Sequence, residues 1–414
     1  MVQIAIMGYG VVGSGVAELI RTHQKRLKDK SKEEVNIKYI LDIRDISGTP
    51  FDGLFTKSFD DIINDDEVKI VVEVMGGVTV AYDYVKRCLF SGKSVVTSNK
   101  ELVAAKGAEL LKIARDNNLN FLFEASVGGG IPIIRPINQC LAANEVDEIA
   151  GILNGTTNFI LTKMIREKMD FSVALKLAQE LGYAERNPSA DIEGHDTCRK
   201  ICILSSLAFG KHVYPEFVHT EGITNLTAKD VEYANIWGGV IKLIGRVKKL
   251  ADGKLDVVVS PMFISHECQL SSVDDVFNAI MVRGDCAGDV IFYGRGAGRL
   301  PTASAVVADI IDCIKHFKAR KYLFWEDSTV DEVIDYNDSE TSLYIRMKCT
   351  DTEAAFELCK ENFGEIRRLY NENSEVTELA IVTEVNKFSY FNNGIKNLED
   401  SGISVESVIR IAGF

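Results

Sequence analysis

The chain has 414 residues, of which 46% are apolar, and a formal net charge of −13 at neutral pH. This length exceeds what one hydrophobic core holds, so we expect two or three globular domains. The strongly negative balance argues against nucleic acid and against an anionic membrane as partners, because both require a basic surface.

The cysteines and the N-terminus indicate the compartment. Nine cysteines are scattered without C-x-x-C spacing, and an odd number without a framework indicates reduced thiols in a cytosol. The first apolar run is short, with no basic leader and no cleavage site, and no stretch reaches the length of a membrane span. We therefore expect a cytoplasmic protein.

The first predicted strand, Val2–Met7, runs into the glycine-rich sequence G-Y-G-V-V-G, and apolar residues at helical spacing follow in Ser14–Arg26. Between a strand and a helix this motif is typical of dinucleotide binding, because the glycines allow a tight turn and the helix N-terminus offers free N–H groups to phosphates. A plain glycine-rich turn is the weaker alternative. The residues expected at the cofactor are Gly8, Gly10, Val11, Val12 and Gly13.

The second predicted strand, Val35–Leu41, ends at Asp42. The acid that binds the cofactor ribose usually comes about 20 residues after the glycines. Asp42 comes later, which we attribute to a charged extension of the first helix, Lys25–Glu34. Asp42 would accept a hydrogen bond from a 2′-hydroxyl and favour NAD, whereas Arg44 would meet a 2′-phosphate and favour NADP. The sequence leaves this choice open.

Strands and helices alternate regularly up to residue 124. This alternation predicts a parallel sheet of the Rossmann type, with ligands at the carboxyl ends of the strands. Lys100 lies at such an end and is expected to overlook the nicotinamide. The further strands are predicted at Lys69–Val74, Ser94–Thr97 and Asn120–Glu124, and the helices at Ala81–Ser91 and Ala104–Asn117.

The sequence E-A-S-V-G-G-G-I-P follows at Glu124–Pro132. Three glycines do not form a stable element interior, so the backbone bends sharply here and exposes carbonyl groups. Carbonyls beside a carboxylate suit a hard cation. A simple hinge into the next domain is the alternative, and these residues by themselves favour the hinge.

The middle of the chain predicts an α+β domain with a mixed sheet covered on one side by helices. The sequence N-G-T-T-N at 154–158 follows a short strand, and its small polar residues either cap the next helix or contact a substrate. A glycine-rich stretch around Gly296 precedes an apolar helix, Pro301–Ile314, which is expected to return to the first domain and face the cofactor. The strands are predicted at Glu148–Leu153, Ile241–Val247 and Leu255–Ser260, the last ending before Pro261, and the helices at Phe159–Glu167, Phe171–Leu181 and Arg199–Phe209.

The stretch Gly182–Lys200 holds several acids and a lysine that precedes an apolar helix. Asp196 and Lys200 are four residues apart and share one helix face. A lysine that enters a core is partly desolvated, which lowers its pKa and suits it to proton transfer. A surface ion pair at a helix start is the ordinary alternative.

Six motifs occur in a fixed order: G-Y-G-V-V-G, T-S-N-K-E-L-V-A, F-E-A-S-V-G-G-G-I-P, L-N-G-T-T-N, L-G-Y-A-E and D-I-E-G-H-D-T-C-R-K. Together they resemble homoserine dehydrogenase from residue 2 to about residue 320. The resemblance implies reversible, NAD(P)-dependent conversion of L-homoserine to L-aspartate 4-semialdehyde, in threonine, isoleucine and methionine biosynthesis. The alternatives are a dehydrogenase of another small amino or hydroxy acid and a non-catalytic NAD(P)-sensing regulator, which has no need for two lysines.

The resemblance also implies residue roles and a homodimer or higher homo-oligomer. Lys200 matches the proton-transferring lysine, and Lys100 matches a second lysine at the reacting carbon. Two lysines at one oxygen lower each other's pKa, whereas Asp196 raises the pKa of Lys200. The direction of the net pKa shift of Lys200 stays open. The residues implied at the substrate are Glu185, Asp191, Asp196 and Thr156. Those implied at the nicotinamide half of the cofactor are Ser98 and Gly182, and Gly296 is a further residue expected at the cofactor. Those implied at a structural sodium ion, held largely by carbonyls, are Glu124, Val127, Gly129 and Ile131.

The C-terminal quarter predicts a βαββαβ order that resembles an ACT regulatory domain. ACT domains typically carry D-x-P-G-V-L at the first strand–helix turn, whereas this chain has D-T-E-A-A-F at 351–356. We predict an ACT-like fold and leave its binding of threonine open, with dimer contacts as the alternative role. The elements are predicted at Ser342–Lys348, Glu353–Phe363, Glu365–Tyr370, Thr377–Val385, Phe388–Asp400 and Ser404–Ile411.

The expected fold class is therefore α/β, with three domains and a small-molecule substrate. The predicted boundaries are 1–130 for the dinucleotide-binding domain, completed by helix 301–316, then 131–320 for the substrate and dimerisation domain, 321–341 for a linker and 342–414 for the ACT-like domain.

Overall fold

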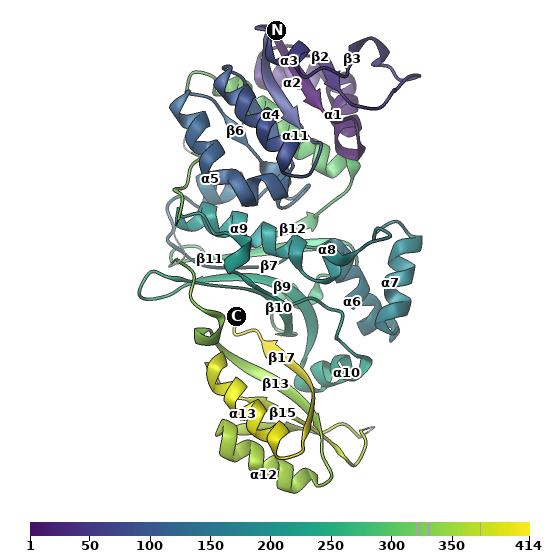
Figure 1. The fold of residues 1–414 in the computed structure, drawn as a ribbon, viewed down its shortest axis with the longest axis vertical. Coiled ribbons are helices and arrows are strands. Elements are labelled where there is room, and N and C mark those ends of the chain that lie inside the picture. Colours follow the sequence, from purple (N-terminus) through teal and green to yellow (C-terminus); the bar gives the residue numbers. More distant parts are fainter. Residues whose placement is uncertain (320–322, 329–331, 373) are drawn as a thin grey trace. The chain divides into compact units, whose positions relative to one another are not determined.

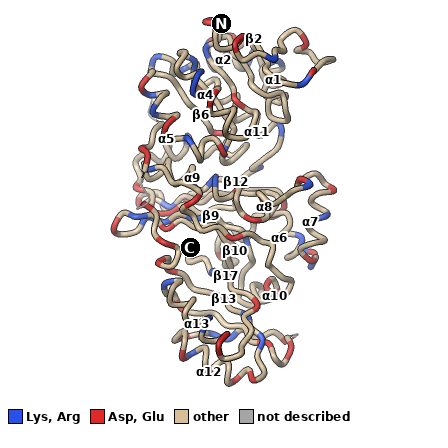
Figure 2. The backbone as a smooth tube through the Cα atoms, in the orientation of Figure 1, with Lys and Arg blue, Asp and Glu red and all other residues tan. Residues whose placement is uncertain are grey.

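The computed structural model describes residues 1–319, 323–328, 332–372 and 374–414 (Figure 1). Acidic and basic residues are interspersed along the whole backbone (Figure 2). None of the nine cysteines forms a disulfide in the described part of the chain. Among the described residues, no helix combines the length and the apolar character needed to cross a lipid bilayer.

The chain divides into two compact units, and the division falls inside helix α9 (His195–Phe209). The first unit is Met1–Asp147, Arg199–Pro215 and Val282–Thr329, and the second is Glu148–Cys198, Glu216–Met281 and Val330–Phe414.

The first unit contains a six-stranded parallel sheet in the order β3-β2-β1-β4-β5-β6. This is the strand order of a dinucleotide-binding Rossmann fold, in which the chain reverses direction across the sheet between β1 and β4 and ligands bind at that point. The predicted parallel sheet is confirmed. The strands are β1 (Val2–Met7), β2 (Val35–Leu41), β3 (Phe55–Thr56), β4 (Val68–Glu73), β5 (Ser94–Thr97) and β6 (Phe121–Leu122).

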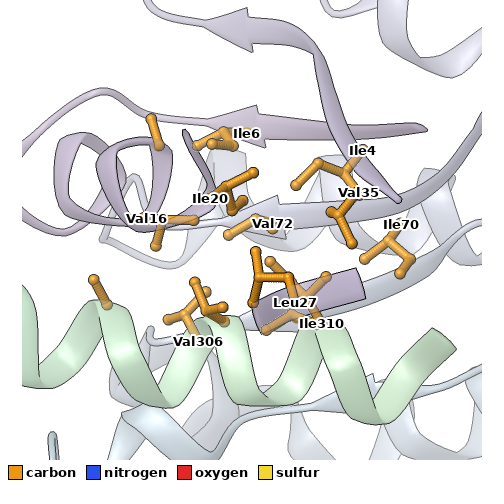
Figure 3. Packing of buried hydrophobic residues seen from close by; sticks show 14 of the residues in the cluster. Ile4, Ile6, Val16, Ile20, Leu27, Val35, Ile70, Val72, Val306 and Ile310 are labelled. Atoms are coloured by element: carbon orange, nitrogen blue, oxygen red, sulfur yellow. The ribbon is translucent and has the colours of Figure 1, made fainter. Parts of the chain in front are cut away.

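Helix α11 closes the core of this sheet from far along the chain. Val306 and Ile310 are buried with Ile6 and Val72 of the sheet (Figure 3). Helices α1 and α11 approach closely, because a Cβ at Gly15 would lie 3.0 Å from that of Ala303. The helices of this unit are α1 (Val11–Thr22), α2 (Gln24–Ser31), α3 (Asp60–Ile63), α4 (Thr79–Phe90), α5 (Lys100–Asp116) and α11 (Arg299–Lys315), and strand β12 (Gly288–Arg295) also lies in it.

The charged extension does not lengthen the first helix, so that part of the prediction was wrong. The chain leaves helical geometry at His23, with φ −108° and ψ 21°, and starts the separate helix α2. Leu27 anchors α2 in the same core as α1. The late position of Asp42 is therefore due to an inserted helix.

The second unit contains a mixed sheet with strand order β11-β7-β9-β10-β17-β13-β15-β14. Strands β9 and β10 form a long antiparallel pair, and β17 runs parallel to β10. The mixed sheet expected for the middle of the chain is confirmed. The strands are β7 (Val146–Ile152), β8 (His219–Thr220), β9 (Gly239–Lys249), β10 (Leu255–Ser265), β11 (Phe277–Gly284), β13 (Glu340–Lys348), β14 (Ile366–Leu369), β15 (Glu378–Thr383), β16 (Asn386–Lys387) and β17 (Ser404–Ile411). The helices are α6 (Gly155–Glu167), α7 (Phe171–Glu180), α8 (Ser189–Ile192), α10 (Ala228–Trp237), α12 (Thr352–Phe363) and α13 (Phe388–Asp400).

Strand β10 continues through Pro261, although proline predicted its end there. Pro261 is paired with Leu243 of β9 on one side. On the other side, β8 pairs with Val258 and Val259 and β17 pairs with Met262 and Phe263. Pro261 has no backbone N–H group, but on this side it lies between the residues that pair with β8 and those that pair with β17. The missing hydrogen-bond donor therefore destabilises the sheet little.

The C-terminal elements follow the predicted order, β13-α12-β14-β15-α13-β17, with the short β16 before α13. Their four main strands are antiparallel. The pairing of β17 with β10 makes this quarter a continuation of the sheet of the second unit. Strand β11 and helix α10 were not predicted from the sequence.

A buried polar network attaches the C-terminal strands to α10. Asp230, which is fully buried, accepts hydrogen bonds from Arg346 Nε at 3.0 Å and from the Tyr344 hydroxyl at 3.2 Å. Arg346 also lies 3.6 Å from Glu378, which accepts from the Tyr233 hydroxyl at 3.0 Å. Breaking a buried ion pair on one side leaves an uncompensated charge, which is strongly destabilising.

We expect Asp230→Ala to lower the free energy of unfolding by at least about 3 kcal/mol, because Arg346 loses its closest carboxylate and α10 loses its capping box. Chemical denaturation followed by circular dichroism measures this. The control is Asn235→Ala, an exposed position on the same helix, which should shift stability by less than about 0.5 kcal/mol. Equal effects of the two substitutions would contradict a stabilising role of the network.

Candidate active site

The glycine-rich turn lies between β1 and α1, where the direction across the parallel sheet reverses. Gly8 has φ +100°, which side chains other than hydrogen rarely allow, and a Cβ at Gly13 would lie 1.9 Å from the carbonyl oxygen of Gly8. Gly10 is the N-cap of α1 and has open space around it. The first N–H groups of α1 therefore face a region in which a pyrophosphate can lie close to the backbone.

Asp42 is held against this turn from the end of β2. Its carboxylate accepts from the Tyr9 backbone N–H at 2.8 Å and from two guanidinium nitrogens of Arg44, at 2.9 and 2.8 Å. The Arg44 side chain holds the pKa of Asp42 well below its usual range. Arg44 is more than half exposed, and it also donates to the Tyr9 carbonyl at 3.0 Å. Both residues expected to read the 2′-position of the cofactor thus act as one hydrogen-bonded pair.

A buried carboxylate that sequence reasoning missed, Glu73, ties together the loops after β4 and β5. It accepts from the Thr97 hydroxyl at 2.6 Å and from the Met75 backbone N–H at 2.8 Å. Thr97 in turn accepts from the Asn99 backbone N–H at 2.9 Å. Burial raises the pKa of Glu73, and these hydrogen bonds act in the opposite direction. Glu73 is a single acid at the end of a strand and belongs to no sequence motif. Its hydrogen bonds could therefore be found only in the structure.

Asn99 places Lys100 at the start of α5. Its side chain accepts from the Leu102 backbone N–H at 3.1 Å and donates to the Gly77 carbonyl at 2.6 Å. Lys100, the first residue of the helix, is half-buried, and Ser98 precedes the cap at the carboxyl end of β5. The helix dipole adds positive potential at this helix start.

Lys200 lies in the part of α9 that belongs to the first unit, and it is only 7% exposed. Glu101, the residue after Lys100, forms an ion pair at 3.4 Å with Arg199, the residue before Lys200. An ion pair thus joins the residue that follows Lys100 to the residue that precedes Lys200.

Helix α5 also has a buried contact with His212. The Trp325 indole N–H donates to His212 Nδ1 at 2.8 Å, so His212 Nε2 carries the proton and donates to the Ala104 carbonyl at 2.8 Å. Trp325 is buried, and a Cβ at Gly107 would lie 2.6 Å from its ring. Trp325 belongs to the segment expected to be a linker, part of which lies outside the described residues, yet it contributes to the core of the first unit.

The loop expected to hold sodium is buried and closely packed. The Glu124 carboxylate accepts from the backbone N–H groups of Ile133, Ile134 and Arg135, at 2.6 to 3.0 Å. Gly129 has φ +57°, and a Cβ there would lie 2.2 Å from the carbonyl oxygen of Gly296. No group of three or more metal-binding side chains occurs among the described residues, so a cation here would depend on carbonyl oxygens.

In the second unit, Asn154 brings together two of the predicted acids. Its side-chain nitrogen donates to Asp191 at 2.7 Å and to Asp196 at 2.8 Å, while its oxygen accepts from the Thr157 backbone N–H at 2.8 Å. The Thr156 hydroxyl donates to the carbonyl of Tyr183 at 2.7 Å, next to Gly182.

The predicted residues thus fall into local groups. The first unit holds the glycine turn with Asp42 and Arg44, and also Ser98, Lys100 and Lys200. The second holds Asp191 and Asp196 with Asn154, and Thr156 beside Gly182. Glu185 is exposed, and no hydrogen bond to its carboxylate is recorded among the described residues. Glu73 and His212, which sequence reasoning missed, hydrogen-bond to Thr97 and Ala104, on either side of Ser98 and Lys100, and no motif marks them.

Comparison with known proteins identifies the family. The profile described as "Homoserine dehydrogenase, NAD binding domain" matches residues 8–124, and that described as "Homoserine dehydrogenase" matches residues 132–311. The chain belongs to the homoserine dehydrogenase family. The homoserine dehydrogenase of Bacillus subtilis is 36% identical over 100% of this chain and 98% of its own length.

Solved structures of homoserine dehydrogenases have the same fold. The enzyme from Thiobacillus denitrificans superposes with a TM-score of 0.91 at 32% identity, covering 99% of this chain and 98% of its own. A hyperthermophilic archaeal homoserine dehydrogenase mutant in complex with NADPH matches with a TM-score of 0.63 at 30% identity, over 75% of this chain and 97% of its own. This homoserine dehydrogenase is an NAD(P)-dependent oxidoreductase that interconverts L-homoserine and L-aspartate 4-semialdehyde.

The glycine turn gives a test that separates folding from cofactor binding. We expect Gly10→Ala to fold normally, because nothing lies near its added methyl group, and to weaken NADPH binding at least about 10-fold by blocking close approach of the pyrophosphate. NADPH fluorescence titration measures the Kd, and thermal unfolding without cofactor is the control. Gly13→Ala should instead lower the Tm, because its methyl group meets the Gly8 carbonyl. Normal NADPH affinity in Gly10→Ala would contradict this placement of the pyrophosphate.

Proposed function

We propose that Lys200 transfers the proton in this homoserine dehydrogenase. Hydride leaves the substrate carbon only as the hydroxyl proton departs, so a base must lie within about 3 Å of that oxygen. In oxidation, neutral Lys200 takes the hydroxyl proton, and in reduction its ammonium returns it to the carbonyl oxygen. The bound NAD(P) supplies the hydride acceptor or donor. The support for this role is that Lys200 is almost fully buried where α9 turns apolar.

Lys100 has a different proposed role, the stabilisation of charge on the same oxygen. Negative charge grows on the carbonyl oxygen as hydride arrives, and a nearby ammonium lowers the energy of that state. The capped start of α5 holds Lys100 at the carboxyl end of β5, with the helix dipole adding to its field. The ion pair between Glu101 and Arg199 supports a shared location with Lys200.

The acids of the second unit are proposed to bind the α-ammonium group of the substrate. Asp191 and Asp196 lie around one side-chain nitrogen, so their charges are concentrated in one place. Glu185 is the third acid proposed by resemblance, and Thr156 is proposed to contact the substrate beside Gly182. A cationic substrate group offsets the repulsion between the carboxylates, which explains why acids gather here.

The pair of Asp42 and Arg44 is proposed to read the 2′-position of the cofactor. Asp42 already accepts from Tyr9 and Arg44, whereas the guanidinium of Arg44 is the exposed member of the pair. An exposed guanidinium suits a 2′-phosphate. The homologous archaeal complex with NADPH agrees with a cofactor of this kind.

We expect Arg44→Ala to weaken NADPH binding at least about 10-fold and to change NADH binding little, because a charge-assisted contact to the phosphate is lost. Asp42→Ala should instead weaken NADH. Fluorescence titration with both cofactors gives the ratio of the two affinities. An unchanged ratio in both variants would show that other residues read the 2′-position.

The remaining proposals concern sodium, the C-terminal quarter and the oligomer. The buried, carbonyl-rich loop of Glu124, Val127, Gly129 and Ile131 supports a structural sodium ion. The βαββαβ order of 342–414 supports an ACT-like domain, and the family profiles end at residue 311. The continuous sheet from β10 to β17 suits a structural role of this domain, such as contacts in a homodimer.

We expect Lys200→Ala to lower kcat at least about 100-fold with NADPH affinity largely kept, because the proton acceptor is removed and the glycine turn is untouched. NADPH absorbance with L-homoserine and with L-aspartate 4-semialdehyde measures both directions. Lys112→Ala, an exposed lysine on α5, is the matched control and should keep full activity. Near-normal turnover of Lys200→Ala would refute the assigned role.

A further inference from the structure

Asn154 performs two tasks with the two ends of one amide. Its Oδ1 accepts from the Thr157 backbone N–H at 2.8 Å and from the Thr157 hydroxyl at 3.1 Å, which caps α6. Its Nδ2 donates to Asp191 Oδ1 at 2.7 Å and to Asp196 Oδ2 at 2.8 Å. A backbone N–H is an obligatory donor, so the oxygen must face Thr157 and the –NH₂ group must face the acids.

Capping alone does not require this arrangement. Asn99 caps α5 in the same way, through its Oδ1 and the Leu102 N–H, but its Nδ2 donates to a backbone carbonyl, that of Gly77. In Asn154 both hydrogens of the –NH₂ group go instead to two carboxylates from α8 and α9. Asn154 is itself buried, and so is Asp196, whereas Asp191 is half-buried.

Two carboxylates beside each other repel, so holding them close together costs free energy. A shared –NH₂ group offsets that cost and fixes one oxygen of each acid. Charge-assisted hydrogen bonds of this kind are roughly twice as strong as neutral ones. The bridge therefore holds one oxygen of each acid in a fixed orientation before any substrate arrives.

We propose that Asn154 is a positioning residue that assembles Asp191 and Asp196 into the binding site for the substrate's α-ammonium group. The inference rests on the proposed role of these two acids. It adds that the capping residue of α6, and not the acids alone, determines recognition of an amino acid over a plain hydroxy acid. Asn154 acts through Asp191 and Asp196 and takes no part in proton or hydride transfer.

Two substitutions separate the cap from the bridge. Asn154→Ser keeps a good N-cap acceptor but is too short to reach both acids, and Asn154→Asp keeps the cap while placing a third carboxylate there. We expect Asn154→Ser to raise the KM for L-homoserine at least about 10-fold and Asn154→Asp to raise it further, with the Kd for NADPH unchanged. Asp351→Ser, the same kind of cap exchange at the start of α12, is the control for stability and should leave the KM unchanged.

A substrate analogue separates positioning from general damage. 4-Hydroxybutyrate lacks the ammonium group, so its inhibition constant should stay the same in Asn154→Ser while the KM for L-homoserine rises. An equal loss for both compounds, or an unchanged KM for L-homoserine, would overturn the inference. In either case the activity of the unsubstituted enzyme and the Lys200→Ala result still test the proposed function independently, because neither depends on Asn154.

Discussion

Within each unit, the positions of the proposed site residues depend on how the first free N–H groups of the helices are satisfied. Helix α5 starts at Lys100 under the Asn99 cap, and α6 starts under the Asn154 cap two residues before Thr156. Helix α1 starts after Gly10 with no side-chain cap, which leaves its N–H groups available to phosphates. The N-cap residues thus determine where the proposed site residues lie on α5 and α6. The missing side-chain cap on α1 leaves its N–H groups for an anion.

Buried charges reinforce these helix starts. Glu73 holds the loops on either side of Asn99, and Arg135 lies between Glu124 and Asp309 at 3.2 and 3.3 Å. Burial raises the pKa of Asp309 to about 8. Such groups are costly unless they are hydrogen-bonded, so each one fixes its surroundings in a single arrangement. Rigid support of this kind is what a hydride-transfer site needs, because small displacements of reacting groups are costly.

The sequence predicted elements whose signal is local. Strands β1, β5 and β17 and helix α13 have the predicted bounds. An apolar run that ends at a glycine turn marks β1, and a glycine turn precedes β5. The prediction from sequence failed where contacts with distant segments determine the structure. Strand β10 continues through Pro261 because the neighbouring strands β8 and β17 leave that residue unpaired on one side. Glu73 and the bridging by Asn154 belong to no motif and follow from contacts between distant segments. The motifs predicted the proposed site residues, whereas the residues that position them were found only in the structure.

The geometry of helix α9 bears on the roles proposed for Asp196 and Lys200, which lie four residues apart. One helical turn separates Asp196 and Lys200, a rise of about 6 Å along the axis. In L-homoserine the amino nitrogen and the hydroxyl oxygen are joined through three carbons, which places them about 5 Å apart when extended. The spacing of the two residues along α9 is therefore close to the length of L-homoserine, which agrees with the roles proposed for Asp196 at the ammonium group and for Lys200 at the hydroxyl group.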